Sequence, residues 1–275
     1  MTGLTAPVLA PRPVHRPTAS PLGEPALMNP VATWRRLLAE FVGTALLVTA
    51  VVGSGIMATT LSPGNVGLQL LQNSVATAFA LGALILAVGP VSGAHFNPVV
   101  SAADWWLGRR HGTGLTAPEL AGYAAVQTLG AIAGSVLANA MFDLAPVTIS
   151  TTSRSGAHLW LGEVVATTGL LLLIFALVRS GRAAVAPAAV GAYIGAAYWF
   201  TSSTSFANPA VTIGRAFTDT FAGIAPASVP AYIGAQLVGL LAGIGLVAAL
   251  YPCAGADADQ VVVPHEDTEP ARSRA

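Results

Sequence analysis

The chain has 275 residues, of which 54% are hydrophobic and only 9% are charged, and its formal net charge is zero at pH 7. Soluble domains carry about a quarter charged residues, so this composition and the mean hydropathy of +0.68 exclude an ordinary soluble protein and indicate an integral membrane protein. The zero net charge gives no sign of a nucleic-acid partner. The single cysteine, Cys253, excludes an internal disulfide and a cysteine metal cluster.

The chain divides into a membrane domain and two tails. Residues 1–32 contain several prolines and no apolar run, which predicts a disordered tail without the apolar core of a secretory signal peptide. Residues 253–275 are polar and acidic, and we predict a second disordered tail there. Residues 33–252 hold the apolar segments, and we expect them to form one domain.

The apolar segments predict six membrane-spanning helices of about the ~20 residues that a bilayer requires. In the first half these run over residues 34–58, 68–91 and 118–142. In the second half one ends at Val178, and two more run over residues 183–200 and 231–251.

Two Asn-Pro pairs lie between these spans, one at Asn97-Pro98-Val99 and the other at Asn208-Pro209-Ala210. Asparagine is a good helix N-cap, and proline suits the first helical position. Each pair therefore predicts a short helix that begins between long apolar segments. A helix that begins at membrane depth is tolerated only where protein surrounds it or where it lines a wet cavity. The alternative is that both asparagines only cap helices.

The second half of the chain repeats the first. The segment Leu161-Gly-Glu-Val-Val-Ala-Thr167 resembles Leu38-Ala-Glu-Phe-Val-Gly-Thr44, and Tyr, Gln and Gly keep one spacing at 123, 127 and 130 and at 232, 236 and 239. Repeat one covers about residues 33–142 and repeat two about residues 157–252. Because each repeat has three spans, the two must enter from opposite sides, an architecture associated with a site at the bilayer midplane.

These features together resemble the aquaporin, or major intrinsic protein, family over about residues 34–252. The resemblance implies an all-α membrane protein with six transmembrane helices and two re-entrant half-helices in a right-handed bundle of two inverted repeats. It implies a passive channel in which the amides of Asn97 and Asn208 donate to passing solute. The opposed positive helix ends then repel protons and cations. It also implies a homotetramer. The expected partners are membrane lipid, water and small neutral solutes.

One position departs from the family pattern. An arginine usually follows the second Asn-Pro-Ala in the narrow filter, but Val211 stands there. Spacing from the Asn-Pro pairs places the other filter residues at Thr77, Ala196 and Ser205, and gaps between the repeats could shift Thr77 and Ala196 by one or two residues. Such small neutral side chains predict a wide filter that admits glycerol, urea or neutral metalloid hydroxides. The alternative is that Arg215 reaches back to fill the place, although Asp219 is a nearby partner for it.

Two carboxylates, Glu40 and Glu163, lie within apolar spans, where a charge is costly. They either form a proton pathway or accept hydrogen bonds from the backbone of the re-entrant loops, and we favour the loop anchors because such loops lack other partners. His95, two residues before Asn97, either lines the vestibule or is packed.

The arginines predict the orientation. Six of them fall on the side that also holds both termini: Arg35, Arg36, Arg109, Arg110, Arg179 and Arg182. By the positive-inside rule this side is cytoplasmic, in a plasma (cell inner) membrane. No catalytic set, metal cluster or phosphate-binding loop is visible, so we expect neither an enzyme nor a cofactor or metal. A secondary transporter, or a non-conducting protein of the same fold, remains the alternative function.

Overall fold

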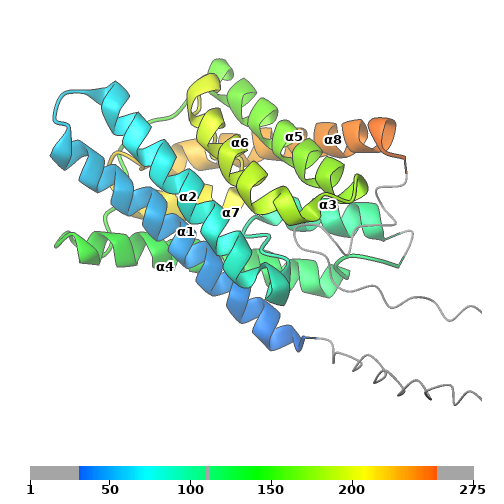
Figure 1. Cartoon of the computed structure of the whole chain (residues 1–275). Helices are drawn as coiled ribbons and strands as arrows, with labels where there is room; N and C mark the ends of the chain where they lie inside the picture. Colours follow the sequence, from blue (N-terminus) through cyan, green and yellow to red (C-terminus); the bar gives the residue numbers. More distant parts are fainter. Residues whose placement is uncertain (1–30, 110–111, 253–275) are drawn as a thin grey trace, which may run out of the picture. The chain divides into compact units, whose positions relative to one another are not determined.

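The structure is a computed structural model that describes residues 31–109 and 112–252. The predicted tails lie outside the described residues, except for residues 31 and 32. The described part is helical and contains no strand. The predicted fold of six long helices and two short ones is confirmed (Figure 1).

Six helices in the described residues are long and apolar enough to cross a membrane. In the first half they are α1 (Thr33–Leu61), α2 (Val66–Ser92) and α4 (Ala117–Met141). In the second half they are α5 (Ala157–Arg179), α6 (Ala186–Phe200) and α8 (Val229–Leu250), with short 3-10 turns leading into α6 and α8. The observed bounds agree with the predicted spans to within a few residues.

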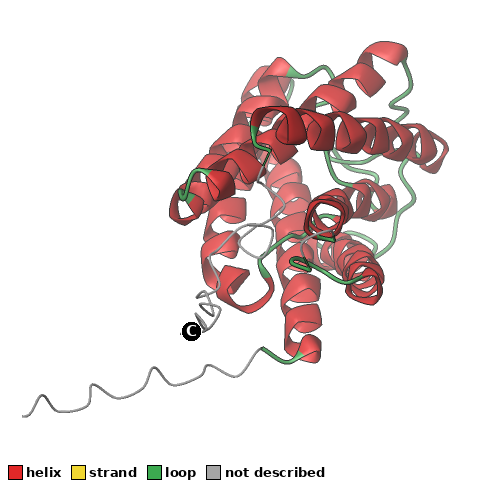
Figure 2. Cartoon of the chain, turned by 90° about the vertical axis from the view of Figure 1, so that its right-hand side faces the viewer, coloured by secondary structure: helices red, strands yellow, loops and turns green. Residues whose placement is uncertain are grey.

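The two short helices follow the Asn-Pro pairs. Helix α3 covers Pro98–Gly108, and α7 covers Pro209–Gly214 and continues as the 3-10 turn Arg215–Phe217. Neither is long enough to cross a bilayer, since a helix rises only about 1.5 Å per residue. Both lie among the long helices (Figure 1), in a structure whose described residues form helices and loops without strands (Figure 2). Helix α3 packs against α4 and α8, and α7 packs against the same two helices.

The packing repeats between the halves. Helix α1 packs against α4 as α5 packs against α8, and α2 contacts α6 across the two halves. At the α1–α4 crossing Gly134 faces the backbone of Ala45, and at the α5–α8 crossing Gly243 faces Leu171. A β-carbon at Gly134 would clash with the Ala45 carbonyl, and one at Gly243 would be tight against the Leu171 side chain. Small residues at four-residue spacing permit such close crossings in membranes.

Candidate pore and its lining

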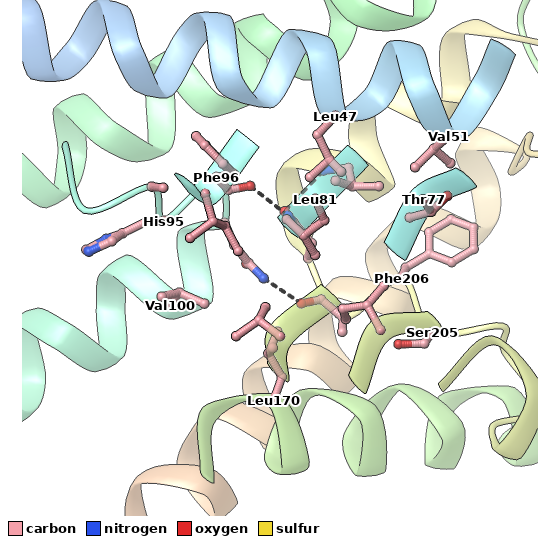
Figure 3. A pocket seen from close by; sticks show the side chains of 18 of the residues that line it. Leu47, Val51, Thr77, Leu81, His95, Phe96, Val100, Leu170, Ser205 and Phe206 are labelled. Atoms are coloured by element: carbon pink, nitrogen blue, oxygen red, sulfur yellow. Dashed lines mark hydrogen bonds between the residues drawn. The ribbon is translucent and has the colours of Figure 1, made fainter. Parts of the chain in front are cut away.

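The two Asn-Pro stretches meet inside the domain. Asn97 and Asn208 cap α3 and α7, because each Oδ1 accepts a hydrogen bond from a backbone N–H of the first turn. The amide nitrogens cross to the opposite stretch: Asn97 Nδ2 donates to the Ala207 carbonyl and Asn208 Nδ2 to the Phe96 carbonyl, each at 2.7 Å (Figure 3). These reciprocal bonds hold the starts of α3 and α7 together. Each amide retains a second N–H, and both asparagines line a cavity.

The loops before the two asparagines carry equivalent backbone strain. Ala94 and Phe96 have φ of 49° and 50°, and their counterparts Ser205 and Ala207 have φ of 50° and 46°. A non-glycine residue in this left-handed region costs roughly 1–2 kcal/mol. Such conformations persist only where the surroundings hold them. Each loop therefore needs strong anchors.

Glu40 supplies the anchor in the first half. Its carboxylate is fully buried and accepts hydrogen bonds from His95 N–H at 2.9 Å and Phe96 N–H at 2.7 Å. It also accepts from the Ser92 hydroxyl at 2.6 Å and from Gln127 Nε2 at 2.8 Å. Four donors satisfy the buried charge, so the carboxylate needs no proton or cation partner.

Glu163 makes the matching set of contacts in the second half. It is fully buried and accepts from Phe206 N–H and Ala207 N–H, each at 2.8 Å, and from Gln236 Nε2 at 2.6 Å. Gln236 also donates to the Thr212 hydroxyl, as Gln127 donates to Ser101. Each half thus holds its loop with its own glutamate–glutamine pair, and the two pairs are equivalent.

A single cavity runs past both asparagines, and four long helices form its wall. Each contributes residues spaced four apart, which share one face of a helix. These are Leu47 and Val51 on α1, Leu81 and Ile85 on α2, Leu170 and Ile174 on α5, and Val190 and Ile194 on α6. The wall is therefore apolar, and the polar groups come mainly from the two loops (Figure 3).

The end of the cavity near the α1–α2 turn, here called the distal end, has a different lining. Thr77 and Tyr198 face each other from α2 and α6, and their hydroxyls are hydrogen-bonded at 3.2 Å. Ser205 and Val211 complete this lining. The buried Ser205 hydroxyl has no hydrogen-bond partner among the described residues.

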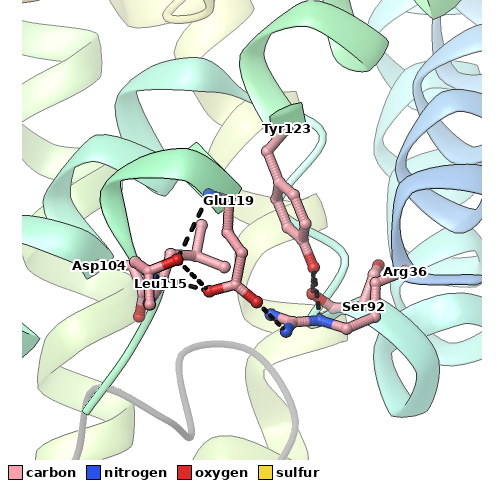
Figure 4. A network of polar contacts seen from close by, with 7 residues as sticks. Arg36, Ser92, Asp104, Leu115, Glu119 and Tyr123 are labelled. Carbon is pink, nitrogen blue, oxygen red and sulfur yellow. Dashed lines mark hydrogen bonds and ion pairs between the residues drawn. The ribbon is translucent and has the colours of Figure 1, made fainter. Parts of the chain in front are cut away.

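The opposite end, here called the proximal end, is held by polar contacts. His95 lines the cavity and is also packed, since its Nδ1 lies 3.0 Å from the Ser101 hydroxyl and its ring meets the edge of Tyr123. Both alternatives for His95 therefore describe its position. Tyr123 in turn donates to the Ser92 carbonyl and accepts from Arg36, which pairs with Glu119 at 2.8 Å (Figure 4).

Comparison with known proteins agrees with this geometry. The family model for the major intrinsic protein matches residues 28–207. The chain is 49% identical over 213 residues to the aquaglyceroporin AqpS of Rhizobium meliloti (strain 1021), covering 78% of this chain and 88% of that protein. The chain belongs to the major intrinsic protein family. It is therefore a multi-pass membrane protein and a passive channel for water and small neutral solutes, as members of this family are channels and not enzymes.

Two further likenesses come from the same family. The chain is 31% identical over 221 residues to the aquaporin AqpM of Methanothermobacter marburgensis, covering 70% of this chain and 87% of that protein. The solved structure of the aquaglyceroporin from Plasmodium falciparum has a TM-score of 0.59 at 20% sequence identity, covering 81% of this chain and 99% of that one. This second likeness shows the fold.

Within this major intrinsic protein, Ala196 does not belong to the cavity lining. Ala196 is exposed on the outer face of α6, whereas Ile194 and Tyr198 line the cavity. The prediction for Ala196 is wrong because each residue turns an α-helix by about 100°, so a residue two places from both Ile194 and Tyr198 points the other way. Tyr198 takes its place opposite Thr77, so an aromatic ring stands where a small side chain was predicted.

Arg215 lies at the distal end of the cavity, beyond Val211. Its guanidinium is 3.5 Å from the centroid of the Phe206 ring, and its Nε donates to the Ala222 carbonyl. The expected partnership with Asp219 is wrong, because Asp219 accepts from the N–H and hydroxyl of Thr151. Asp104, the first-half counterpart of Arg215, accepts from Leu115 N–H and so holds a loop (Figure 4).

Sequence reasoning left three groups of this site without a role. Gln127 and Gln236 are polar residues at equivalent positions of the two repeats, each inside an apolar span. This pattern predicts that each one has an equivalent buried partner in its own half. Tyr198 follows from the four-residue stripe Val190, Ile194 and Tyr198. The sequence around Arg154 does not indicate its role, because the residues that it contacts lie about seventy positions away in the chain.

Substitution of Asn208 by aspartate tests separately its two roles, the capping of α7 and the hydrogen bond to the Phe96 carbonyl. The carboxylate still accepts the N–H groups of Ala210 and Val211, so α7 remains capped. It repels the Phe96 carbonyl in place of the lost donor, and it offers acceptors to the solute. We expect Asn208→Asp to lower glycerol permeability strongly and to weaken cation exclusion in proteoliposomes. Unchanged flux and exclusion would show that the asparagine only caps the helix.

Proposed function

We propose that this channel admits glycerol, urea and neutral metalloid hydroxides as well as water, because four neutral side chains form its selectivity filter, with Arg215 farther out at the distal end of the same cavity. The filter consists of Thr77, Tyr198, Ser205 and Val211. Val211 carries the proposal, because the cavity has an apolar side chain where the family pattern has an arginine. A valine removes both the bulk and the fixed charge of that arginine. The free Ser205 hydroxyl can bind one solute hydroxyl at a time.

The remaining wall suits solutes that are only partly polar. Aliphatic side chains from four helices contact the carbon face of a polyol, while Asn97 and Asn208 each offer an amide N–H to its oxygens. The half-helix N-termini at the same point carry partial positive charge, which opposes a hydrated proton or cation. The high identity to a protein named an aquaglyceroporin supports glycerol as one solute.

The carboxylates act in this proposal as loop anchors and not as a proton pathway. Both are fully buried, and both already accept from backbone N–H groups and a glutamine. They are absent from the cavity lining among the described residues. The asparagine tips that they position are therefore the functional groups.

We further propose that the protein is a homotetramer in the plasma (cell inner) membrane, with both termini in the cytoplasm. The orientation follows from the six arginines that the sequence assigns to the side of both termini and from the positive-inside rule. The exposed apolar residues on the long helices supply surface for lipid and for neighbouring subunits. Chemical crosslinking of the purified protein and protease access to each tail test these two points.

A permeability series on one preparation tests the solute range. Proteoliposomes are exposed in a stopped-flow instrument to gradients of water, glycerol, urea and arsenous acid, with empty liposomes as the reference. We expect rapid flux of water and glycerol and measurable flux of the other two solutes. Rapid water flux with full exclusion of glycerol contradicts the neutral wide filter.

A further inference from the structure

A second cavity opens at the distal end, next to the pore. Two arginines, Arg154 and Arg215, line it together with Tyr198, Asn73 and Thr204. Arg215 and Tyr198 also line the pore cavity. The second cavity is therefore the outer vestibule of the same passage, and whatever binds there lies at the pore entrance.

The two arginines converge on one aromatic ring and one loop. The guanidinium of Arg215 lies 3.5 Å from the centroid of Phe206, and that of Arg154 lies 5.2 Å from it. Arg215 Nε donates to the Ala222 carbonyl. Arg154 donates to the carbonyls of Phe221 and Gly223, the residues on either side of Ala222. The shared ring and loop hold the two cations close together, although like charges repel.

Most of the donor capacity of Arg215 is unused. A guanidinium has five N–H groups, and among the described residues the Nε–H of Arg215 alone has an acceptor. Arg215 is only 3% exposed, and it lines both the pore cavity and the second cavity. Arg154 lies beside the Tyr232 hydroxyl, and burial lowers the pKa of its guanidinium.

The described residues place no carboxylate in contact with either cation. Their single ion pair joins Arg36 to Glu119 at the proximal end. Asp219 is occupied by Thr151, and Glu163 by two backbone N–H groups and Gln236. The arginine pair therefore brings two positive charges to one cavity, and Glu163 acts on both of them electrostatically without touching either.

We propose that Arg154 and Arg215, with the Tyr198 hydroxyl beside them, form a binding site for a small oxyanion at the pore entrance. Phosphate-like and carboxylate anions fit its chemistry, because a guanidinium donates parallel N–H groups to two oxygens. The bound anion supplies a negative charge in direct contact with the two guanidinium groups, which Glu163 does not. It also lies against Tyr198 and Arg215, so it narrows the entrance to the filter.

Two consequences follow for the channel, and the second rests on the proposed function. Oxyanions bind at the distal end and stabilise the folded protein by mass action. A saturating oxyanion then lowers the flux of neutral solutes such as glycerol. The vestibule thus couples the passage of neutral solutes to the anions outside it.

Thermal unfolding of the full chain in neutral detergent micelles tests the binding. Inorganic phosphate is titrated at fixed pH and ionic strength, with chloride as the reference ion. Phosphate stabilises many proteins weakly through exclusion from their surface. The decisive result is therefore a saturable rise in Tm that is specific to the arginine pair. A rise no larger than in the Arg154→Gln variant overturns the proposal.

Two variants complete this design. Arg179→Gln removes an exposed arginine at the end of α5 and is expected to keep the full phosphate response. Arg154→Lys retains the charge without the planar fork and is expected to bind more weakly than wild type. If Arg154→Gln does not fold, calorimetry of wild type with phosphate decides, and absence of binding heat overturns the site. A Tm rise with phosphatidylglycerol but not with phosphate overturns a dissolved oxyanion as the occupant.

Flux separates this inference from the proposed function. Glycerol permeability is measured in proteoliposomes with phosphate or chloride on both sides. We expect phosphate to lower the permeability of wild type and to have no effect on Arg154→Gln. If wild type conducts no glycerol in chloride, the proposed function is contradicted. The anion site is then tested by the Tm measurement alone. Normal flux in chloride without any phosphate effect contradicts the blockade at the entrance.

Discussion

Glu163→Gln is expected to destabilise the folded channel by several kcal/mol and to leave much less folded protein in the membrane. The carboxylate accepts three hydrogen bonds from Phe206 N–H, Ala207 N–H and Gln236. A hydrogen bond to a charged group contributes about 1.5–3 kcal/mol, and an unsatisfied buried N–H costs a similar amount. A glutamine keeps one acceptor and presents an NH2 group to a donor. Detergent-resistant folded protein, measured by fluorescence-detected size-exclusion chromatography and thermal unfolding, checks the loss.

Glu119→Gln is the matched control for this prediction. Glu119 is also a glutamate near the end of a long helix, but it is half-buried and pairs with Arg36 at the proximal end. Partly exposed ion pairs contribute roughly 0–1 kcal/mol, so we expect this variant to fold almost normally. A Glu163→Gln protein that folds normally and leaks protons would show instead that the carboxylate belongs to a proton pathway.

Val211→Arg is expected to convert the wide filter into a strict one. Val211 lines the same cavity as Thr77 and Ser205, and we expect an arginine at this position to fill the space that a glycerol molecule needs. It also adds a third cation beside Arg215 and Arg154. We expect glycerol permeability to fall at least about tenfold, or roughly 1.4 kcal/mol in the barrier, while water permeability falls much less.

The control for Val211→Arg is a variant with a long but uncharged side chain at the same position. Val211→Met adds bulk to the same position, and its flexible side chain can move aside. We expect an intermediate loss of glycerol flux, measured by stopped-flow light scattering on the same proteoliposomes. Glycerol flux in Val211→Arg equal to that in wild type contradicts the assignment of Val211 to the filter.

The repeat made most of the fold predictable from sequence. The Asn-Pro pairs, the glutamates and the glutamines keep their spacing in both halves, and the structure brings each set together. Amino-acid chemistry alone says that a buried carboxylate and a strained loop need donors and acceptors. Their pairing was therefore predictable once the halves were aligned.

The filter was harder to predict, because it depends on rotation about a helix axis. A difference of two residues along α6 separates Ala196, which is exposed on the outer face, from Tyr198, which lines the cavity. Motif spacing cannot detect that difference, but the four-residue stripe on α6 can. The partners of Arg215 were missed because Phe206, Ala222 and Arg154 meet only through tertiary contacts.

The central claim is that α3 and α7 line one passage from opposite ends. Single cysteines test it most directly in a Cys253→Ser background, with Val100→Cys on α3 and Val211→Cys on α7, both in the cavity lining. Ala196→Cys, on the exposed face of α6, is the control. Glycerol flux is measured before and after a small neutral thiol reagent, with modification verified by mass spectrometry. We predict that modification at 100 or at 211 stops the flux and that modification at 196 leaves it unchanged. A channel that conducts normally after complete modification at 100 or at 211 contradicts the claim.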